Sequence, residues 1–498
     1  MEYYHLAFFY TALAIGILTL YGILKRANGW YYAIKFCSKK YNIPPGDMGW
    51  PFVGNTLFYF KCSMMGDPGS FLSYFVTRFG PGGMYKGYIF GKPSIIVTKP
   101  EIITKILMDE ENLDRGLPNY MKKLVGLTTT FKEDKCIRRL IAPIKGQRLL
   151  SNFIECIDRI VKTTFEKYAA TEEPIEFLSK MKKLTFEVFM RILVGGEVNQ
   201  ELFDEVFKES TFLNCGIISL PINIQGFAYN RAIQARGSLA KIFQQLLEER
   251  RKAMVIIAED YKANMPKSNI IDMLLLDTNQ DDYDDDDGKR LSDEQIIRML
   301  ILFAFAGYDP AALMATKAII FLEKHPEFLQ KAKEEQEDIV KSRPSSNVGL
   351  NFDEIRRMKY LSKVINETLR IASNQTVFLK DTNTPYNING YTIPKGWRFF
   401  ANLWNIHMDP NTFVKPQEFN PSRWDDLETK PGTFLPFGMG PRGCPGSNLA
   451  RLEISVILHY FLLYYRVEQI NPEIKTHPPE NYLVRFKKLS VCTNCNLF

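Results

Sequence analysis

Cys444 lies in the part of this chain with the clearest capacity for chemistry, a loop rich in glycine and proline from Phe437 to Gly446. The glycines of this loop let the backbone turn tightly and approach a flat ligand closely. Backbone N–H groups that point at the sulfur would hold it as a thiolate, the form of cysteine that ligates metals. Of the 8 cysteines only Cys444 has this setting, so the sequence predicts a metal or cofactor site with one cysteine ligand.

The type of metal follows from what surrounds Cys444 in the sequence. No second cysteine or histidine stands nearby at the spacing of zinc ligands, which argues against zinc. Haem iron needs only one protein thiolate and fits the pattern. The alternative without chemistry is a surface turn that contains a buried thiol.

The loop resembles the haem-binding signature of the cytochromes P450, which are haem-thiolate monooxygenases. The matching positions are Phe437, Gly440, Arg442, Cys444 and Gly446. The resemblance implies that Cys444 ligates the iron of haem b and that Arg442 contacts a haem propionate. It also places Phe437 and Gly446 in the cofactor site.

Three charged residues outside the loop strengthen the resemblance. Glu367 and Arg370 are three residues apart in a helical segment, a spacing that by itself indicates only an ordinary ion pair. Arg423 lies in the stretch from Pro416 to Trp424, which matches the arginine-bearing meander of the family. By resemblance, these three residues form a buried charge triad that braces the cysteine loop.

Two further cations stand where the resembled family binds the haem propionates. Arg138 occupies the position of a propionate-binding arginine on a helix. Lys380 lies near a strand position where relatives usually carry arginine, and lysine keeps the charge but not the bidentate geometry. The alternative for each is a solvated surface cation.

The segment from Phe305 to Ala312 resembles the family helix that crosses the distal face of the haem, where oxygen binds. Gly307 and Asp309 match the family pattern, but Pro310 replaces the usual alcohol. Proline has no N–H and clashes with the carbonyl of residue 306, so the helix must kink or open there. The missing hydroxyl normally orders the proton donor, and Thr316 is nearly two turns away.

Pro310 leaves three interpretations of the reaction open. Ordered water, Asp309 or a substrate hydroxyl supplies protons to a monooxygenase, which is the preferred interpretation. Alternatively, the protein is a haem-dependent isomerase or dehydratase that needs no reductase. The third interpretation is a non-catalytic haem-binding scaffold.

Length and composition describe the setting of this site. A chain of 498 residues with 46% hydrophobic residues can form a large core or two lobes. The net charge of +7 is scattered rather than clustered among aromatics, which favours a membrane surface or an acidic partner over nucleic acid. The few cysteines for this length indicate a reducing environment.

The N-terminus carries an uncharged apolar stretch from Leu6 to Leu24. At 1.5 Å per residue it can just cross a hydrocarbon core of about 30 Å. Basic residues follow it, which predicts a single-pass anchor in the endoplasmic reticulum membrane with the remaining chain cytoplasmic. We therefore expect an anchor over 1–26, a basic and proline-rich hinge over 27–51 and a haem-thiolate catalytic domain over 52–498.

The expected fold is mainly α with a smaller β-rich lobe, the cytochrome P450 fold, after one N-terminal transmembrane helix. Strands are expected within 82–97, with a turn at Gly91, and a hairpin at Asn389-Gly390. Ser292 and Gln295 have the spacing of a capping box that opens a long apolar helix. The segments expected to face substrate are 117–127, 215–227, 303–308 and 374–378.

Several stretches narrow the resemblance to the plant ent-kaurenoic acid oxidase family and its triterpenoid-oxidising relatives. They include 45–51, 75–80, 226–229, 389–397 and 453–455, spread over nearly the whole chain. The resemblance implies oxidation of a polycyclic terpenoid with O2 and electrons from NADPH through NADPH-cytochrome P450 reductase. Gibberellin-pathway members keep an alcohol where this chain has Pro310, so a specialised triterpenoid or diterpenoid oxidase is expected, with a kaurenoic acid oxidase as the alternative.

Overall fold

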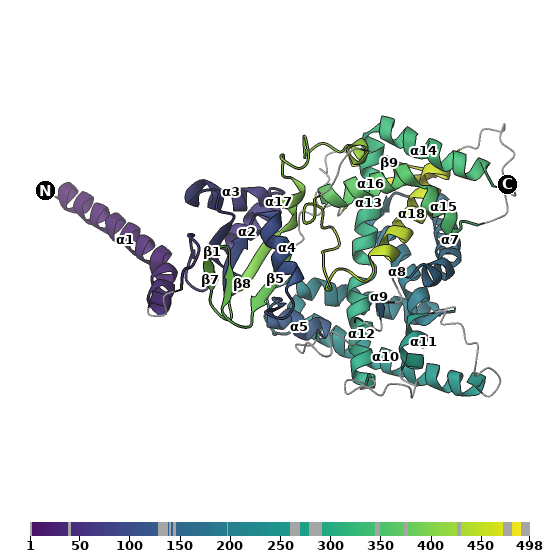
Figure 1. The fold of residues 1–498 in the computed structure, drawn as a ribbon, viewed down its shortest axis with the longest axis horizontal. Coiled ribbons are helices and arrows are strands. Elements are labelled where there is room, and N and C mark those ends of the chain that lie inside the picture. The colour runs from purple at the N-terminus through teal and green to yellow at the C-terminus, as the bar shows by residue number, and fades with distance from the viewer. Residues whose placement is uncertain are drawn as a thin grey trace. The chain divides into compact units, whose positions relative to one another are not determined.

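The structure is a computed structural model whose chain divides into two compact units (Figure 1). The first unit comprises Met1–Pro118, Arg370–Glu418 and Leu427–Gly443, and the second comprises Asn119–Leu369, Phe419–Asp426 and Cys444–Phe498. The structure describes residues 2–37, 41–127, 138, 141–142, 146–196, 198–258, 269–277, 291–343, 349–372, 377–425, 430–471 and 481–489.

A five-stranded sheet forms the centre of the first unit, with the strand order β1-β2-β8-β5-β3. Only the β2–β8 pair of this sheet is parallel; the other neighbours are antiparallel. The alternation of apolar and polar residues in β1 buries one face, as expected for a half-covered strand. The strands are β1 (Met84–Ile89), β2 (Lys92–Val97), β3 (Leu113–Arg115), β5 (Val377–Thr382) and β8 (Arg398–Asn402).

Both expected hairpins of this unit are confirmed. Strands β1 and β2 meet at Phe90 and Gly91, whose φ angles are 51° and 77°. Strands β6 (Tyr386–Ile388) and β7 (Tyr391–Ile393) meet at Asn389 and Gly390, with φ angles of 48° and 79°. Glycine and asparagine adopt such left-handed conformations readily, which explains why the Asn-Gly pair predicted the second hairpin.

Short helices cover this sheet with their apolar faces. Asp67 caps α3 by accepting a hydrogen bond from the Ser70 N–H at 3.2 Å, and Pro68 supplies a first helical position that needs no donor. Helix α4 buries four aliphatic side chains in the sheet core. The helices are α2 (Thr56–Met64), α3 (Pro68–Phe79), α4 (Pro100–Met108) and α17 (Leu403–His407).

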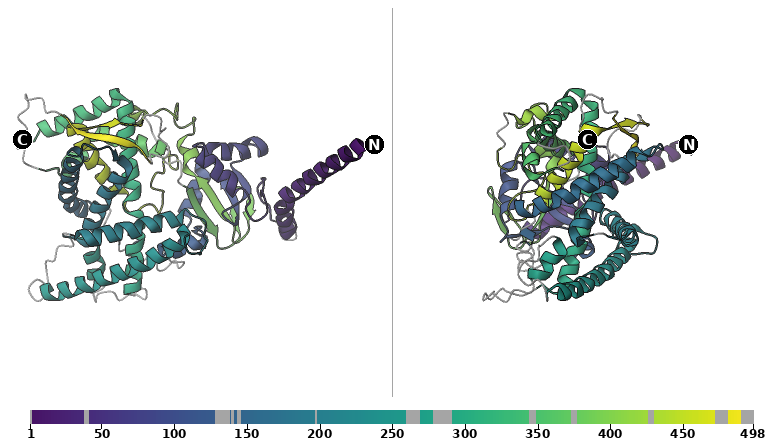
Figure 2. Two further views of the ribbon diagram at one scale, coloured as in Figure 1. Left: turned by 180° about the vertical axis from the view of Figure 1, so that it is seen from behind. Right: turned by 90° about the vertical axis from the view of Figure 1, so that its right-hand side faces the viewer.

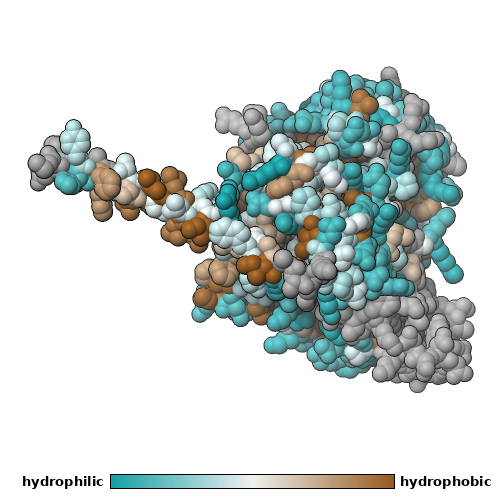
Figure 3. Space-filling model, turned by 60° about the vertical axis from the view of Figure 1, so that its left-hand side comes forward, coloured by the Kyte–Doolittle hydropathy of each residue, from teal (hydrophilic) through white to brown (hydrophobic). Residues whose placement is uncertain are grey.

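Helix α1 (Glu2–Cys37) precedes the sheet and is apolar enough, over Phe8–Phe36, to cross a membrane. Figure 3 shows hydrophobic side chains on its surface. Helix α1 continues through residues 27–37 of the segment expected as a hinge, because its end packs on the first unit, and the expected domain boundaries stay predictions. Tyr32 and Phe36 lie one turn apart and place their ring centroids 6.0 and 5.7 Å from that of Trp397. Packing of this stripe explains why the helix continues through the basic segment.

The second unit is helical. A small antiparallel sheet of order β4-β10-β9 joins its helices, with β9 and β10 in yellow in Figure 2. The strands are β4 (Ile175–Glu176), β9 (Tyr465–Gln469) and β10 (Leu483–Lys488). The helices are α5 (Asn119–Val125), α7 (Gln147–Ala169), α8 (Phe177–Val194), α9 (Gln200–Ile217), α10 (Ala228–Ala258), α11 (Ile270–Asp277), α12 (Asp293–Ala306), α13 (Asp309–Lys324), α14 (Pro326–Lys341), α15 (Phe352–Arg357), α16 (Lys359–Ala372, which extends past Leu369) and α18 (Ser447–Tyr464). The prediction of a mainly helical protein with a smaller β-rich lobe is confirmed.

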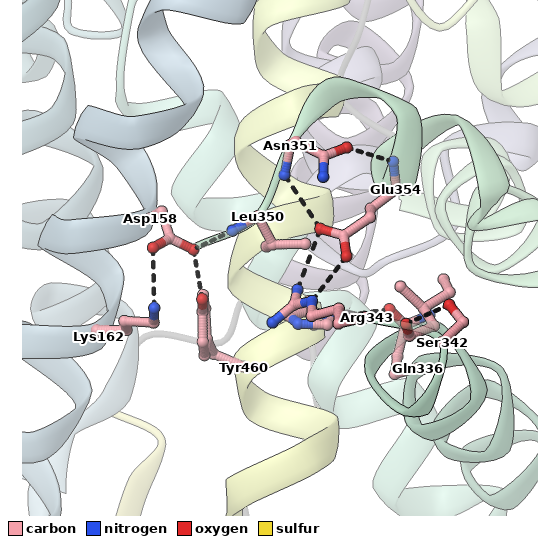
Figure 4. A network of polar contacts seen from close by, with 11 residues as sticks. Asp158, Lys162, Gln336, Ser342, Arg343, Leu350, Asn351, Glu354 and Tyr460 are labelled. Carbon is pink, nitrogen blue, oxygen red and sulfur yellow. Dashed lines mark hydrogen bonds and ion pairs between the residues drawn. The ribbon is translucent and has the colours of Figure 1, made fainter. Parts of the chain in front are cut away.

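Helix α18 is the buried centre of this unit, and a polar network ties its neighbours to it (Figure 4). The Tyr460 hydroxyl donates to Asp158 of α7, which also pairs with Lys162 at 3.0 Å. Arg343 holds Glu354 of α15 in two hydrogen bonds of 2.6 and 3.2 Å. Because buried charges are costly without partners, these pairs fix how the helices pack.

Candidate active site

The cysteine loop has the tight backbone that its glycines predicted. Gly438 and Gly440 have φ angles of 72° and 73°, and the Gly443 N–H donates to the Gly440 carbonyl at 3.0 Å. A side chain at Gly440 would meet Met108, because an added Cβ would lie 2.9 Å from the Met108 sulfur. Glycine is therefore required there for both conformation and space.

Cys444 is exposed and lies three residues before the first residue of α18. The positive end of the helix dipole favours an anion at this place, which suits a thiolate. Gly446 is the N-cap of α18 and accepts a hydrogen bond from the Ala450 N–H at 2.8 Å. Phe437, at the start of the loop, is half-buried.

A buried lysine with two arginines near it lies in the first unit. Lys380 on β5 is 5% exposed, and its ammonium has no hydrogen-bond partner among the residues that the structure describes. Burial, together with repulsion by Arg442, lowers the pKa of Lys380 to about 8; attraction by Glu110 opposes this and repulsion by Arg115 adds to it. Arg442 pairs with Glu110 at 3.2 Å. A buried ammonium without a hydrogen-bond acceptor favours an anionic ligand beside it.

This cluster fits the two carboxylates of haem. A propionate beside Lys380 would supply the missing acceptor and relieve the repulsion by Arg442. Arg138, the other expected propionate contact, is helical and half-buried in the second unit. Both neighbours of Arg138 in sequence lie outside the described residues, and its role in haem binding stays a prediction.

Glu367 on α16 is fully buried and holds the meander segment. One of its oxygens, Oε1, accepts from Arg423 Nε at 2.8 Å and from the Asn420 N–H at 3.0 Å. The other, Oε2, accepts from the Trp424 indole N–H at 3.0 Å. Arg423 and Trp424 belong to a short 3-10 helix, η2 (Pro421–Trp424), so one carboxylate fixes this turn through three donors.

Arg370, the third member of the expected triad, is buried and directs its guanidinium to main-chain carbonyls of the first unit. It donates to the His407 carbonyl at 2.8 Å and to that of Glu418 at 3.4 Å. His407 in turn accepts a hydrogen bond at Nε2 from the Leu435 N–H at 2.9 Å. Arg370 thereby supports, through His407, the chain that leads into the cysteine loop.

His407 is a residue that the sequence interpretation missed. Burial and the neighbouring Arg370 lower its pKa to about 3, so its ring stays neutral and keeps a lone pair for Leu435. The sequence signal is slight: His407 is one of 5 histidines and follows the apolar Ile406 before a turn.

The long helix is interrupted where Pro310 predicted it. Helix α12 ends at Ala306 with Gly307 as its C-cap, and α13 begins at Asp309 with Pro310 in its first turn. The capping box of Ser292 and Gln295 at the start of α12 is also confirmed. Proline removes the hydrogen bond that would join the two helices, so the opened turn consists of Gly307 and Tyr308.

Side chains from α8 contact this opened turn. Asp309 pairs with Lys182 at 2.7 Å, and the Thr185 hydroxyl lies 3.1 Å from the Tyr308 carbonyl. Tyr308 itself is buried, with its hydroxyl 3.3 Å from the amide nitrogen of Asn214. The Thr316 hydroxyl is buried and has no hydrogen-bond partner within the described part of the chain. Lys182 and Thr185 carried no signal in the sequence.

Comparison with known proteins adds the family. The family model described as Cytochrome P450 matches residues 44–493. The chain belongs to the cytochrome P450 family.

Two curated relatives of this P450 match along nearly all of both chains. The beta-amyrin 11-oxidase of Glycyrrhiza uralensis is 40% identical over 478 residues, covering 94% of this chain and 95% of the relative. Ent-kaurenoic acid oxidase 2 of Arabidopsis thaliana is 40% identical over 487 residues, covering 96% and 97%. The expected resemblance is thus confirmed.

A solved structure agrees with the P450 fold. The retinoic acid-bound cyanobacterial CYP120A1 superposes with a TM-score of 0.74 at 23% identity, covering 90% of this chain and all of the other. As a P450 the chain is a haem-thiolate monooxygenase, an enzyme that uses O2, a redox partner and a hydrophobic substrate. Cys444, the cations around the buried Lys380 and the braced meander fit the residues such an enzyme needs.

Proposed function

We propose that this P450 is a membrane-anchored monooxygenase that hydroxylates or otherwise oxidises a polycyclic triterpenoid or diterpenoid in plant specialised metabolism. The observation that carries the proposal is the identity of about 40% along the whole chain to plant oxidases of such terpenoids. The 7,8-epoxymelianol synthase of Citrus sinensis, 41% identical over 461 residues, has the same relationship.

The proximal residues hold haem b in this proposal. Cys444 ligates the iron, Phe437 and Gly446 line the cofactor, and Lys380, Arg442 and Arg138 neutralise the propionates. When bound, haem supplies the activation of dioxygen for insertion into an unactivated C–H bond. Glu367, Arg370 and Arg423 keep the segments around the loop in place.

The distal residues position substrate and protons. Asp309 is the acidic side chain that directly follows the opened turn of Gly307 and Tyr308, and we assign to its carboxylate the holding and passing of a proton. The loss of the alcohol at 310 favours a specialised terpenoid oxidase over a kaurenoic acid oxidase. In segment 215–227, Ile218, Leu220 and Ile224 are exposed apolar side chains suited to an apolar substrate or a membrane.

The cellular setting completes the proposal. Helix α1 anchors the chain in the endoplasmic reticulum membrane, and the basic residues Lys25, Arg26 and Lys35 keep the catalytic domain on the cytoplasmic side. NADPH-cytochrome P450 reductase is the redox partner.

Co-expression with this reductase in a host supplied with polycyclic terpenoids, followed by mass spectrometry of the products, tests the proposal. An oxidised terpenoid that requires NADPH supports it. Product formed without NADPH indicates an isomerase or dehydratase instead. A normal thiolate spectrum with no terpenoid-induced shift and no NADPH consumption indicates a scaffold.

A further inference from the structure

One face of α8 contacts the opened turn residue by residue. Lys182, Thr185 and Phe189 are spaced by three and four positions, so they lie on the same side of the helix. Lys182 pairs with Asp309, Thr185 reaches the Tyr308 carbonyl, and Phe189 packs on Gly307. Each step along α8 from Lys182 to Phe189 thus contacts the next residue back along the chain from Asp309 to Gly307, although the two segments are distant in sequence.

We propose that these three side chains, the α8 clamp, are positioning residues that hold the turn opened by Pro310 and orient Asp309 for proton delivery. The role given to Asp309 rests on the proposed function. The holding of the turn does not, because it follows from the contacts alone.

The turn needs support from outside its own helix. Pro310 cannot donate to the Ala306 carbonyl, and Tyr308 has a φ of −127°, outside the helical range. The Tyr308 carbonyl accepts from the Ala312 N–H at 3.0 Å, and the Thr185 hydroxyl lies 3.1 Å from the same carbonyl and 3.2 Å from that of Lys182, the farther of its two acceptors. Thr185 is fully buried, so water does not compete for this bond.

Phe189 fixes the other side of the turn. An added Cβ on Gly307 would lie 2.5 Å from Cδ2 of the Phe189 ring, so the ring rests directly on the glycine backbone. The Tyr308 ring packs against Phe186 of α8 and Phe207 of α9, with centroids 5.0 and 5.9 Å apart. Main chain and side chain of the turn are therefore both held by neighbouring helices.

Lys182 has a different part in the clamp. Its ion pair with Asp309 is about one-third exposed on both sides, and such a pair contributes little to stability. Its effect is directional, because the ammonium draws the carboxylate toward α8. Removing Lys182 should therefore change proton delivery more than folding.

Hydrogen exchange tests the holding of the turn in the full-length, haem-loaded protein. Thr185→Val should speed exchange of the Ala311 and Ala312 amides about tenfold. In a Pro310→Ala background, where residue 310 can again donate to Ala306, the same substitution should have less than about a twofold effect. Thr163→Val on α7, which removes an exposed hydroxyl bonded within its own helix at 2.9 Å, is the matched control. Equal acceleration by Thr185→Val in both backgrounds, or none in either, overturns the clamp.

Coupling measurements test the orientation of Asp309. Lys182→Met should lower the product formed per NADPH at least threefold and raise the solvent deuterium isotope effect, with substrate-induced spectral binding unchanged. Lys182→Arg should restore both values. Lys180→Met on the same helix is the control, since that ammonium lies 5.8 Å from the Tyr168 ring centroid. Unchanged coupling in Lys182→Met refutes the role of Lys182.

The two experiments separate the inference from the proposed function. If no terpenoid is oxidised, the proposed function fails while exchange still reports on the turn. If products form but exchange shows no dependence on Pro310, the inference alone fails.

Discussion

The carboxylate of Glu367 should be worth several kilocalories per mole to the fold that supports the haem site, and Glu367→Gln tests this with minimal change of shape. The amide oxygen can replace Oε1 and still accept from Arg423 and Asn420. The amide NH2 then replaces Oε2 and faces the Trp424 indole N–H, which accepts nothing.

The expected loss has two parts. The Trp424 N–H is left without an acceptor in a buried place, at a cost of about 1–3 kcal/mol. The bond from Arg423 loses its charge partner, and the difference between charged and neutral hydrogen bonds is about 1 kcal/mol. Together these give about 3 kcal/mol, because the site is buried and water cannot replace the lost interactions.

Thermal unfolding, followed by loss of the thiolate band of the reduced carbon monoxide complex, measures this loss. At roughly 1 °C per kcal/mol for a chain of this size, the midpoint should fall by roughly 3 °C. Glu418→Gln is the control: its side chain is 60% exposed and pairs with Lys415 at 3.1 Å, so it should shift the midpoint by no more than about 1 °C. Equal midpoints for the two variants would refute the bracing role of Glu367.

Three further predictions concern other parts of the account. Cys444→Ser should abolish the thiolate band of the reduced carbon monoxide complex, and survival of that band contradicts the assignment of the ligand. In the haem-free protein, burial holds the pKa of Lys380 near 8 instead of 10.5, so the unfolded chain binds more protons between these values and the free energy of unfolding rises with pH across this window. Lys380→Met should abolish that rise in a series of urea denaturations, and a slope identical to wild type counts against the buried ammonium. Tyr460→Phe should lower stability by about 1–2 kcal/mol in thermal unfolding, because Asp158 loses a buried donor, while Tyr464→Phe on the same helix should be nearly neutral.

Features set by neighbouring residues could be predicted from the sequence. The capping box at Ser292, the Asn389-Gly390 hairpin and the interruption at Pro310 each depend on local hydrogen bonding or on allowed φ values. The backbone of the cysteine loop belongs with them, since the positive φ of Gly440 follows from a local turn, whereas the contact of Gly440 with Met108 does not.

Features that depend on contacts between distant segments could not be predicted. In the sequence, Lys182 and Thr185 look like ordinary helix residues. Only the fold shows that they contact the turn before Asp309 and Asp309 itself. The role of His407 follows from its hydrogen bonds with Arg370 and Leu435, which lie far from it in sequence. The helical extension of α1 past residue 27 likewise depends on packing against Trp397, because charge and proline content alone suggested a hinge.

Oxygen transfer to a terpenoid is the central claim, and the source of the oxygen in the product tests it most directly. The full-length P450, with its reductase, NADPH and a polycyclic terpenoid, is run under isotopically labelled dioxygen, and the product mass is measured. The account predicts one labelled oxygen atom for each hydroxyl introduced and no product without NADPH. A product that carries no labelled oxygen, or that forms equally without NADPH, contradicts it.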